Sequence, residues 1–301
     1  VKIFANQLVQ KGYNISVICG RLKNKSIFDN DGNINVYPII EYGPLHYYIS
    51  KIPILNIFSK LVRYLETGFK IYRKLCIINY KNKIDLVEYS EGGDFWNRLT
   101  KKFKYLSHLH GSAFTFLQNS NQNISLSDIL QRKAEHQFIR GANKVFSPSY
   151  SMVKLVESEM GTTIKNAFVV PYPINRVDLT KGLVAGDIAS RGKVSILFAS
   201  RNDPVKGGEH LINALKRLSR PIKEKIQVNI YGYKPKYDTS KSKFLSLYNC
   251  MSRDELKLVY NNAVICIIPS FFDNSPNTVY EAMSHAKIIV ASSVGGISEI
   301  I

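Results

Sequence analysis

The stretch SFFDNSPNTVYEA, residues 270–282, follows the apolar run VICIIPS and leads directly into a helical pattern. Pro276 suits the first position of a helix, and Ser275 before it is a candidate N-cap. A buried strand that ends in polar residues at a helix start is typical of open α/β sheets, where ligands bind beyond the carboxyl ends of the strands. The stretch therefore predicts a parallel α/β fold with a ligand loop at this position.

The residues of this loop favour an anionic ligand. The amides of Asn277 and Thr278 would lie in the first helical turn, where backbone N–H groups lack partners within the helix. The carboxylates of Asp273 and Glu281, eight residues apart, could contact two parts of one ligand, such as sugar hydroxyls. The alternative is that Asp273 helps to cap the helix and that Glu281 lies on the surface.

Short apolar runs of this kind recur in two series, with helix-like segments between them. Near-continuous apolar strands are what parallel sheets buried on both faces require, so the alternation predicts two doubly wound α/β units. Periodicity is lost between residues 173 and 192, where we place the join. The runs cover residues 14–20, 33–39, 85–90, 104–111, 144–149 and 167–173, then 194–200, 226–232, 264–270 and 287–293.

The helix-like segments include a basic amphipathic stretch at 54–76 and a segment at 252–263 whose Ser252 and Glu255 form a capping box. Others are expected at 126–140, 150–160 and 208–218. Residues 1–12 read as a helix with no strand before it, and the chain stops as a further helix begins. We therefore expect the sequence to be truncated at both ends.

Composition bounds the class of protein. The 301 residues are 45% hydrophobic and carry a formal net charge of +18. This excess favours an anionic partner, which could be a phosphate-bearing substrate, an acidic membrane or a nucleic acid; a solvated lysine-rich surface is the alternative. The four cysteines form no CxxC pair and suit a reducing compartment, and neither a signal peptide nor a membrane-spanning run is evident. We therefore expect a cytoplasmic protein.

Two other strand ends carry related features. RNDPVKGG places Arg201 and Lys206 before a helix entered through two glycines, and VGGISE places Glu299 after a glycine turn. Two cations beside a helix N-terminus suit a diphosphate and would neutralise its charge as it leaves. Taken alone, the first motif fits a solvated basic loop equally well.

Together these motifs resemble the donor domain of family 4 glycosyltransferases. The order is R-x4-K-G-G, then D-x7-E followed by AM, then VGG-x2-E. ANKVFSPSYSMVKLV, VVPYPIN and LSHLHGSAF resemble parts of that family's acceptor domain. The resemblance implies a GT-B fold, with two Rossmann-like domains facing a cleft. It assigns residues 1–175 to the acceptor-side domain, without its first strand, and 190–301 to an incomplete donor domain.

The resemblance also implies roles for the donor-side residues. Arg201 and Lys206 would bind the diphosphate of a nucleotide sugar, and Glu281 would hydrogen-bond its ribose. The segment from Ser275 to Thr278, with Asn277 between them, would contact phosphate or sugar. A family member of this kind is expected to work without a metal ion or other cofactor, the nucleotide sugar being its co-substrate.

On the catalytic and acceptor sides the resemblance implies fewer roles. Asp273 stands where the family usually has Glu, near the transferred sugar, and His110 would line the cleft beside that sugar or the incoming hydroxyl. Glu91 and Asp94 follow a strand in EGGD and are candidates for contact with acceptor hydroxyls; a polar turn is the alternative. No protein residue is assigned as the general base, because the family retains anomeric configuration and its leaving phosphate is often proposed for that role.

The predicted function is that of a retaining, hexosyltransferase-type glycosyltransferase. It would move a sugar from a nucleotide-diphosphate sugar to a glycan or lipid-linked acceptor in cell-surface polysaccharide synthesis. The basic helix at 54–76 could contact the inner face of an anionic membrane. A nucleotide-sugar epimerase or hydrolase of the same fold is the alternative, and a nucleic-acid-binding role lacks a supporting motif. The truncated chain itself could be inactive.

Three further features concern metal binding and the end of a helix. Asp29-Asn30-Asp31 spells DxD, a metal motif of another glycosyltransferase fold, but the glycine after it favours a turn. His108 and His110 share a strand face and could ligate zinc, but no third ligand is near in sequence. Ala286 follows the Glu281 helix where the family often has Gly, and Ala tolerates a left-handed helix end less well.

Overall fold

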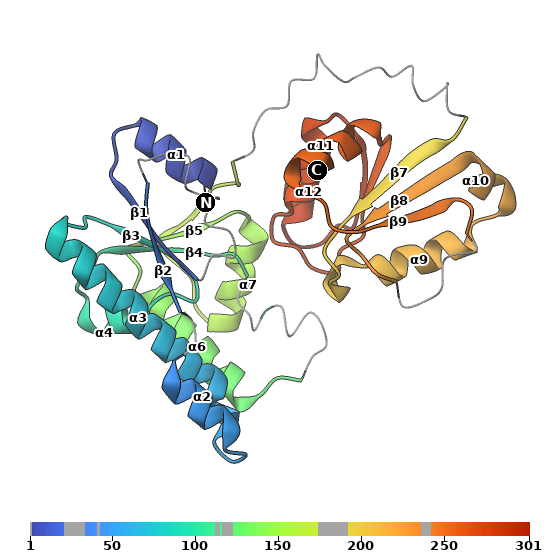
Figure 1. Ribbon diagram of the computed structural model, residues 1–301. Coiled ribbons are helices and arrows are strands. Elements are labelled where there is room, and N and C mark those ends of the chain that lie inside the picture. Colours follow the sequence, from blue (N-terminus) through green and yellow to red (C-terminus); the bar gives the residue numbers. More distant parts are fainter. Residues whose placement is uncertain are drawn as a thin grey trace. The chain divides into compact units, whose positions relative to one another are not determined.

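The computed structural model describes residues 2–20, 34–40, 43–111, 115, 123–173, 192–235 and 242–301. It divides into two compact units, which are described separately (Figure 1). Unit 1 comprises Val1–Ser147 and Val153–Pro173, and unit 2 comprises Pro148–Met152 and Ile174–Ile301. All described strand pairs are parallel, which confirms the predicted α/β class.

Unit 2 has a five-stranded parallel sheet in the order β11-β10-β7-β8-β9. From β7 the chain runs outward through β8 and β9, then returns to the other side of β7 for β10 and β11, so the order reverses between β7 and β10. Such a switch point is where open α/β sheets bind ligands. The strands are β7 (Val194–Ala199), β8 (Ile226–Tyr231), β9 (Leu245–Tyr248), β10 (Ile265–Ile268) and β11 (Ile288–Ala291).

Helices cover both faces of this sheet because its strands are apolar on both sides. Ile196 and Phe198 of β7 pack with Leu211 of the helix after it, whereas Leu197 between them packs with Tyr260 and Ala282 on the opposite face (Figure 1). The helices are η4 (Pro204–Lys206), α9 (Gly208–Arg217), α10 (Arg220–Lys225), α11 (Arg253–Asn262), α12 (Asn277–Ser284) and η5 (Gly295–Glu299).

Unit 1 contains a four-stranded parallel sheet, β3-β4-β5-β6, and the parallel pair β1-β2. Tyr89, Tyr105 and Phe138 form the centre of its buried aromatic core. The strands are β1 (Ile15–Gly20), β2 (Ile34–Ile39), β3 (Val87–Ser90), β4 (Tyr105–His108), β5 (Lys144–Ser147) and β6 (Ala167–Val169). The helices are α1 (Lys2–Gln10), α2 (Pro44–Lys51), η2 (Asn56–Phe58), α3 (Ser59–Lys81), α4 (Phe95–Thr100), α6 (Leu126–Arg140) and α7 (Tyr150–Met160), of which the first three residues belong to unit 2.

One predicted helix has different limits in the structure. The basic helix expected at 54–76 begins only at Ser59 and extends to Lys81. Pro53 lies in the turn before it, and a separate helix, α2, precedes that turn. The predicted start is wrong because the apolar residues of the turn continue the spacing of those in the helix, although the backbone changes direction between them. The other predicted helices are confirmed to within a residue or two.

Local signals were more reliable. The capping box at the start of α11 is confirmed, since Ser252 and Glu255 each accept a backbone hydrogen bond from the other. The Asp29-Asn30-Asp31 turn and most of the predicted join at 173–192 lie outside the described residues. No helix in the described ranges is long and apolar enough to span a bilayer.

Candidate functional site

The loops after β7 and β10 meet at the switch point of unit 2. Gly207 has φ +74°, and a Cβ atom there would lie 1.9 Å from the carbonyl oxygen of Pro269. The Phe271 amide donates to the carbonyl oxygen of Val205 at 2.8 Å. Only a glycine permits both this conformation and this approach of two backbones. The glycine turn in RNDPVKGG therefore fixes one strand-end loop against the next.

Lys206 and Asp273 form an ion pair where these loops meet. The Lys206 Nζ lies 2.5 Å from Asp273 Oδ2, and the two side chains are 23% and 11% exposed. A carboxylate at this distance fixes the position of the ammonium group by a charge-assisted hydrogen bond. Arg201, at the start of the same loop, is exposed. The pair therefore places a cation at the edge of the site with part of its surface open to a ligand.

The glycine turn before η5 joins the same group of loops. Gly295 has φ +52°, and Cβ atoms at Gly295 and Gly296 would lie 2.0 and 1.7 Å from the carbonyl oxygens of Asp273 and Asn274. The Gly296 amide donates to Asp273 O at 3.0 Å. The structure thus brings the three predicted strand-end loops together. Glu299 is directed elsewhere within unit 2, where its carboxylate accepts from backbone amides of the segment Pro148–Met152.

The start of α12 corrects one detail of the prediction. Pro276, not Ser275, is the N-cap residue, and no side chain caps the helix. The Ser275 hydroxyl instead donates to the Tyr280 hydroxyl at 3.2 Å. Pro276 adopts an extended conformation, so the helix begins at Asn277, one residue later than expected. The amides of Asn277 and Thr278 then belong to the first turn, where intrahelical acceptors are absent.

A tyrosine that the sequence did not single out holds Glu281. The Tyr260 hydroxyl of α11 donates to Glu281 Oε2 at 3.0 Å. Burial raises the pKa of Tyr260, and the Glu281 charge raises it further, so the phenol remains a donor. Tyr260 comes from α11 and Glu281 from α12. Its contact with α12 depends on how the two helices pack on the sheet.

In unit 1, the predicted His110 lies in the loop after β4. Its ring Nδ1 lies 2.5 Å from the Tyr172 hydroxyl, and its ring stacks on His108 with centroids 4.3 Å apart. Burial lowers the pKa of His110 to about 4, and the neighbouring His108 lowers it as well. The imidazole is therefore neutral near pH 7. Tyr172, in the PYP sequence after β6, was not predicted to belong to this group.

Glu91 supports the backbone of the His110 loop. Its carboxylate accepts hydrogen bonds from the amides of His110 and Gly111. Burial raises the pKa of Glu91 to about 7, although these hydrogen bonds oppose the increase. The contacts fit the polar-turn alternative, and contact with an acceptor remains a prediction.

Asp94 also has a structural role, because it caps a helix. It is fully buried and caps α4, accepting from the amides of Trp96 at 2.9 Å and Asn97 at 3.3 Å. Burial raises its pKa to about 6. Its contact with an acceptor likewise stays a prediction. Within the described ranges, no three His, Cys, Asp or Glu side chains are grouped so that they could hold a metal ion.

Comparison with known proteins agrees with this geometry. Residues 193–301 match the family model described as "Glycosyl transferases group 1". No curated protein sequence matches the chain. Among solved structures, sucrose-phosphate synthase from Thermosynechococcus elongatus is similar, with a TM-score of 0.72 and 17% identity over 99% of this chain and 76% of that one.

Two further structures show the same overall likeness. A glycosyltransferase from Rickettsia africae has a TM-score of 0.65 and 17% identity, covering 99% of this chain and 76% of that one. A UDP-forming α,α-trehalose-phosphate synthase from Burkholderia xenovorans has a TM-score of 0.68 and 11% identity, covering 99% and 83%. These similarities establish the GT-B fold.

Proposed function

We propose that this protein is a retaining glycosyltransferase that uses a nucleotide-diphosphate sugar, since residues 193–301 match the family model of the glycosyl transferases group 1 and the chain has the GT-B fold. The observation that carries the proposal is the arrangement at the switch point of unit 2. There the Lys206–Asp273 pair and the first turn of α12 lie at the carboxyl ends of adjacent strands. This is where a doubly wound sheet binds a nucleotide.

Each donor-side group has a chemical task in this proposal. Lys206 and Arg201 bind the diphosphate and stabilise the negative charge that develops as it leaves. The amides of Asn277 and Thr278 donate hydrogen bonds to a phosphate or sugar oxygen. Glu281, held by the Tyr260 hydroxyl, accepts hydrogen bonds from the ribose. Because two cations and a helix terminus supply the positive charge, we propose that transfer needs no metal ion.

The reaction exchanges one glycosidic bond for another. The bond between the anomeric carbon and the diphosphate oxygen breaks, and the nucleoside diphosphate leaves with the electron pair. The acceptor oxygen bonds to the anomeric carbon on the same face, and its proton passes to the leaving phosphate. Asp273 lies near the transferred sugar in this proposal, where it also positions Lys206. The neutral imidazole of His110 suits an uncharged sugar or hydroxyl.

For the acceptor, the proposal names a chemical class, and for the location, a cellular compartment. A glycan or lipid-linked acceptor of cell-surface polysaccharide synthesis fits the strongly basic charge of the chain, since such acceptors lie beside anionic membranes. The four cysteines are free, which fits the reducing environment of the cytoplasm. We therefore propose that the protein acts at the cytoplasmic face of the membrane.

Incubation with a panel of nucleotide sugars tests the function. The panel is supplied with EDTA, with and without oligosaccharides and a bacterial lipid extract as acceptors. We expect nucleoside diphosphate release to depend on the acceptor and the product to keep the anomeric configuration of the donor. Donor consumption without acceptor would identify the hydrolase or epimerase alternative. Failure of every donor to react would contradict the proposal.

A further inference from the structure

The turn that joins α2 to α3 exposes a group of apolar side chains. Every residue from 51 to 57 is exposed, and neither α2 nor η2 contains a buried residue. The exposed fractions reach 81% at Ile54 and 65% at Tyr48. We call this group the apolar tip. Its members are Leu45, Tyr47, Tyr48, Ile52, Ile54, Leu55 and Ile57.

The tip belongs to a helical hairpin whose polar groups face inward. Glu66 of α3 accepts from the amides of Leu45 and His46 at 3.0 and 2.9 Å, which caps the start of α2. The His46 ring Nδ1 lies 2.9 Å from the carbonyl oxygen of Ser59. The polar contacts therefore hold the two helices together, while the apolar side chains point outward. This is the reverse of the pattern expected for a solvated hairpin.

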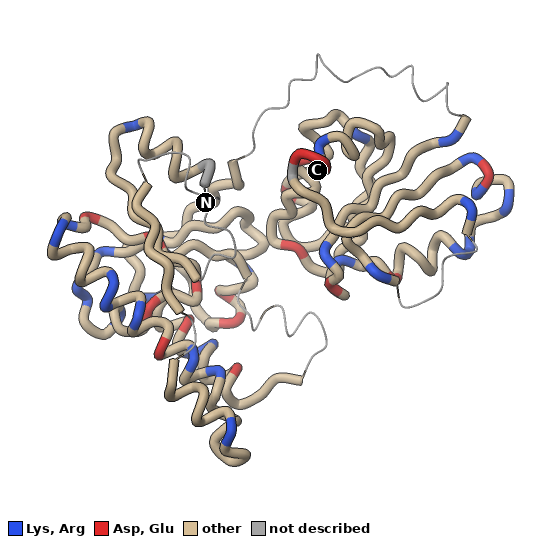
Figure 2. The backbone as a smooth tube through the Cα atoms, viewed as in Figure 1, with Lys and Arg blue, Asp and Glu red and all other residues tan. Residues whose placement is uncertain are grey.

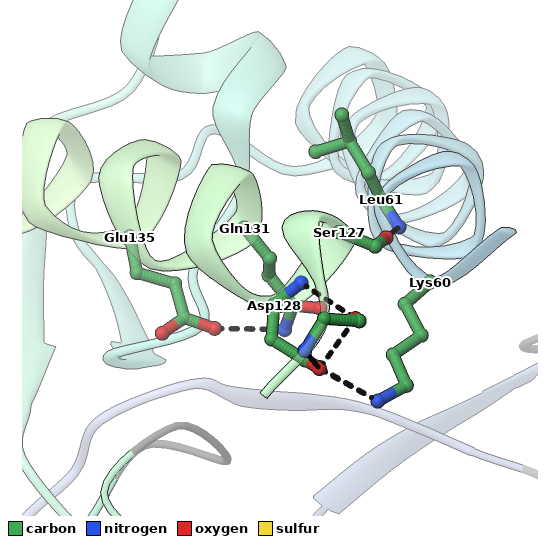
Figure 3. Close-up of polar contacts among 7 residues, drawn as sticks. Lys60, Leu61, Ser127, Asp128, Gln131 and Glu135 are labelled. Atoms are coloured by element: carbon green, nitrogen blue, oxygen red, sulfur yellow. Dashed lines mark hydrogen bonds and ion pairs between the residues drawn. The ribbon is translucent and has the colours of Figure 1, made fainter. Parts of the chain in front are cut away.

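The base of the hairpin is attached to α6 (Figure 3). Lys60 donates to both carboxylate oxygens of Asp128 at 2.8 and 2.9 Å, and the Leu61 amide donates to the Ser127 hydroxyl at 2.9 Å. Asp128 also forms the capping box of α6 with Ser125. The orientation of the tip is thus fixed by the fold of unit 1, so the apolar side chains are presented in a set direction.

The chain that forms the tip carries only basic charges, and Glu66 behind it caps α2. Residues 43–65 contain no Asp or Glu, but they include Lys51, Lys60 and Arg63. The Lys51 Nζ lies 4.2 Å from the centroid of the Tyr47 ring, directly beside the exposed apolar group. Figure 2 shows the end of the hairpin as tan chain with blue but no red. A large apolar group bordered by cations complements a surface that is apolar inside and anionic outside.

We infer that the apolar tip inserts into the interfacial region of an anionic lipid bilayer and so docks unit 1 on a membrane. Tyrosine suits the headgroup region, and isoleucine and leucine suit the acyl boundary beneath it. Exposed apolar groups of this kind on a soluble protein surface mark interaction sites. The absence of acidic side chains from this stretch favours an anionic bilayer over a protein surface of mixed charge.

This assignment moves the membrane contact away from the basic face of α3. Three cations of that face are engaged within unit 1. Lys60 pairs with Asp128, the Lys70 Nζ donates to the carbonyl oxygen of Ile40, and the Lys74 Nζ lies over the Tyr37 ring at 5.6 Å. Insertion at the tip, rather than charge along the helix, is therefore the main interaction.

The position of the tip relates docking to the acceptor side of unit 1. The tip follows β2 and precedes α3, which leads back to the start of β3. His110 follows the carboxyl end of β4, the strand paired with β3. Docking at the tip would thus hold unit 1, which carries the proposed acceptor side, against the bilayer.

Co-flotation with vesicles tests the inference independently of transfer activity. The full chain is mixed with phosphatidylcholine vesicles that contain or lack phosphatidylglycerol. We compare the parent with Tyr48→Ser/Ile54→Ser/Ile57→Ser, and with Ile77→Ser/Tyr80→Ser as a matched control. Ile77 and Tyr80 are 49% and 93% exposed at the opposite end of α3. All five side chains are exposed, so thermal unfolding should be unchanged.

We expect the parent and control to float with phosphatidylglycerol vesicles, and the tip variant to bind at least about tenfold more weakly. Failure of the parent to float would overturn the inference, as would equal binding by the tip variant. If the parent instead forms a dimer that the tip variant loses, with no vesicle binding, the tip contacts a second copy and the inference is wrong. None of these outcomes depends on glycosyl transfer, which is measured separately.

Discussion

Both units end their parallel strands in loops with acidic side chains, but they use these side chains differently. In unit 2, Asp273 pairs with Lys206 at the edge of the site, where part of the cation remains open. In unit 1, Glu91 and Asp94 are buried and accept hydrogen bonds from the backbone amides of His110 and Trp96. The comparison indicates a charged site for an anion in unit 2. The two carboxylates of unit 1 instead support the backbone of the loops that follow its strands.

The largest effect is expected from Asp273→Asn. This substitution removes the charge that holds Lys206, so the diphosphate is bound less well in the transition state, and we expect transfer to fall about 100-fold or more. The rate of nucleoside diphosphate release with saturating acceptor measures this effect. Asp254→Asn is the matched control, because Asp254 forms an exposed pair with Lys257 in the same unit. If Asp273→Asn keeps the parental activity, Asp273 has no role in transfer, and the contrast with the structural carboxylates of unit 1 is lost.

Unit 1 should lose stability as pH rises, because its buried carboxylates favour the protonated form. Burial raises the pKa of Glu135 from 4.5 to about 7. Its contribution is fully present below pH 4.5 and is lost as the pH rises through 7. The difference is up to about 3 kcal/mol.

Denaturant unfolding at low and neutral pH measures this dependence. Glu135→Gln keeps the side-chain size but cannot ionise, so it should be the more stable protein above pH 7 and should show a weaker pH dependence. Glu91 would account for part of the remainder, since its pKa is raised in the same direction. Identical dependence of unfolding free energy on pH in the parent and Glu135→Gln would show that burial does not raise the pKa of this carboxyl.

Substitution at Asp94 separates a structural role from contact with an acceptor. Asp94→Ala removes two hydrogen bonds at the start of α4 and should cost about 1–2 kcal/mol in the free energy of unfolding. Asp94→Asn can still cap the helix, so it should keep most of this stability and the parental transfer rate. Loss of transfer in a stable Asp94→Asn protein would favour the acceptor role instead.

The smallest effect is expected where an alanine occupies a left-handed helix end. Ala286, which follows the Glu281 helix, has φ +52°. Ala286→Gly should raise the free energy of unfolding by about 1 kcal/mol, because glycine adopts this conformation without steric cost. Gly161→Ala is the reverse control. Gly161 has φ +63° and no atom within 4 Å of an added Cβ, so alanine should destabilise the protein there through backbone strain alone. A loss of stability in Ala286→Gly would contradict this reasoning.

Features encoded within a few residues could be predicted from the sequence. The strand-end loops of unit 2 and the Ser252–Glu255 capping box belong to this group. The partners of the site residues could not, because packing brings them together from distant positions. Tyr260 and Glu281 are 21 residues apart, and Tyr172 and His110 are 62 apart. Their contacts depend on helix packing and loop paths that apolar periodicity does not specify.

Calorimetric titration of the full chain with uridine, guanosine and adenosine diphosphates tests the central claim most directly. The claim is that the charged loops of unit 2 bind the diphosphate of the donor. We predict that at least one of these nucleotides binds, that Arg201→Ala/Lys206→Ala weakens its binding by about tenfold or more, and that Arg217→Ala on α9 leaves it unchanged. Absence of binding by all three nucleotides, or equal affinity in the double variant, would contradict the account.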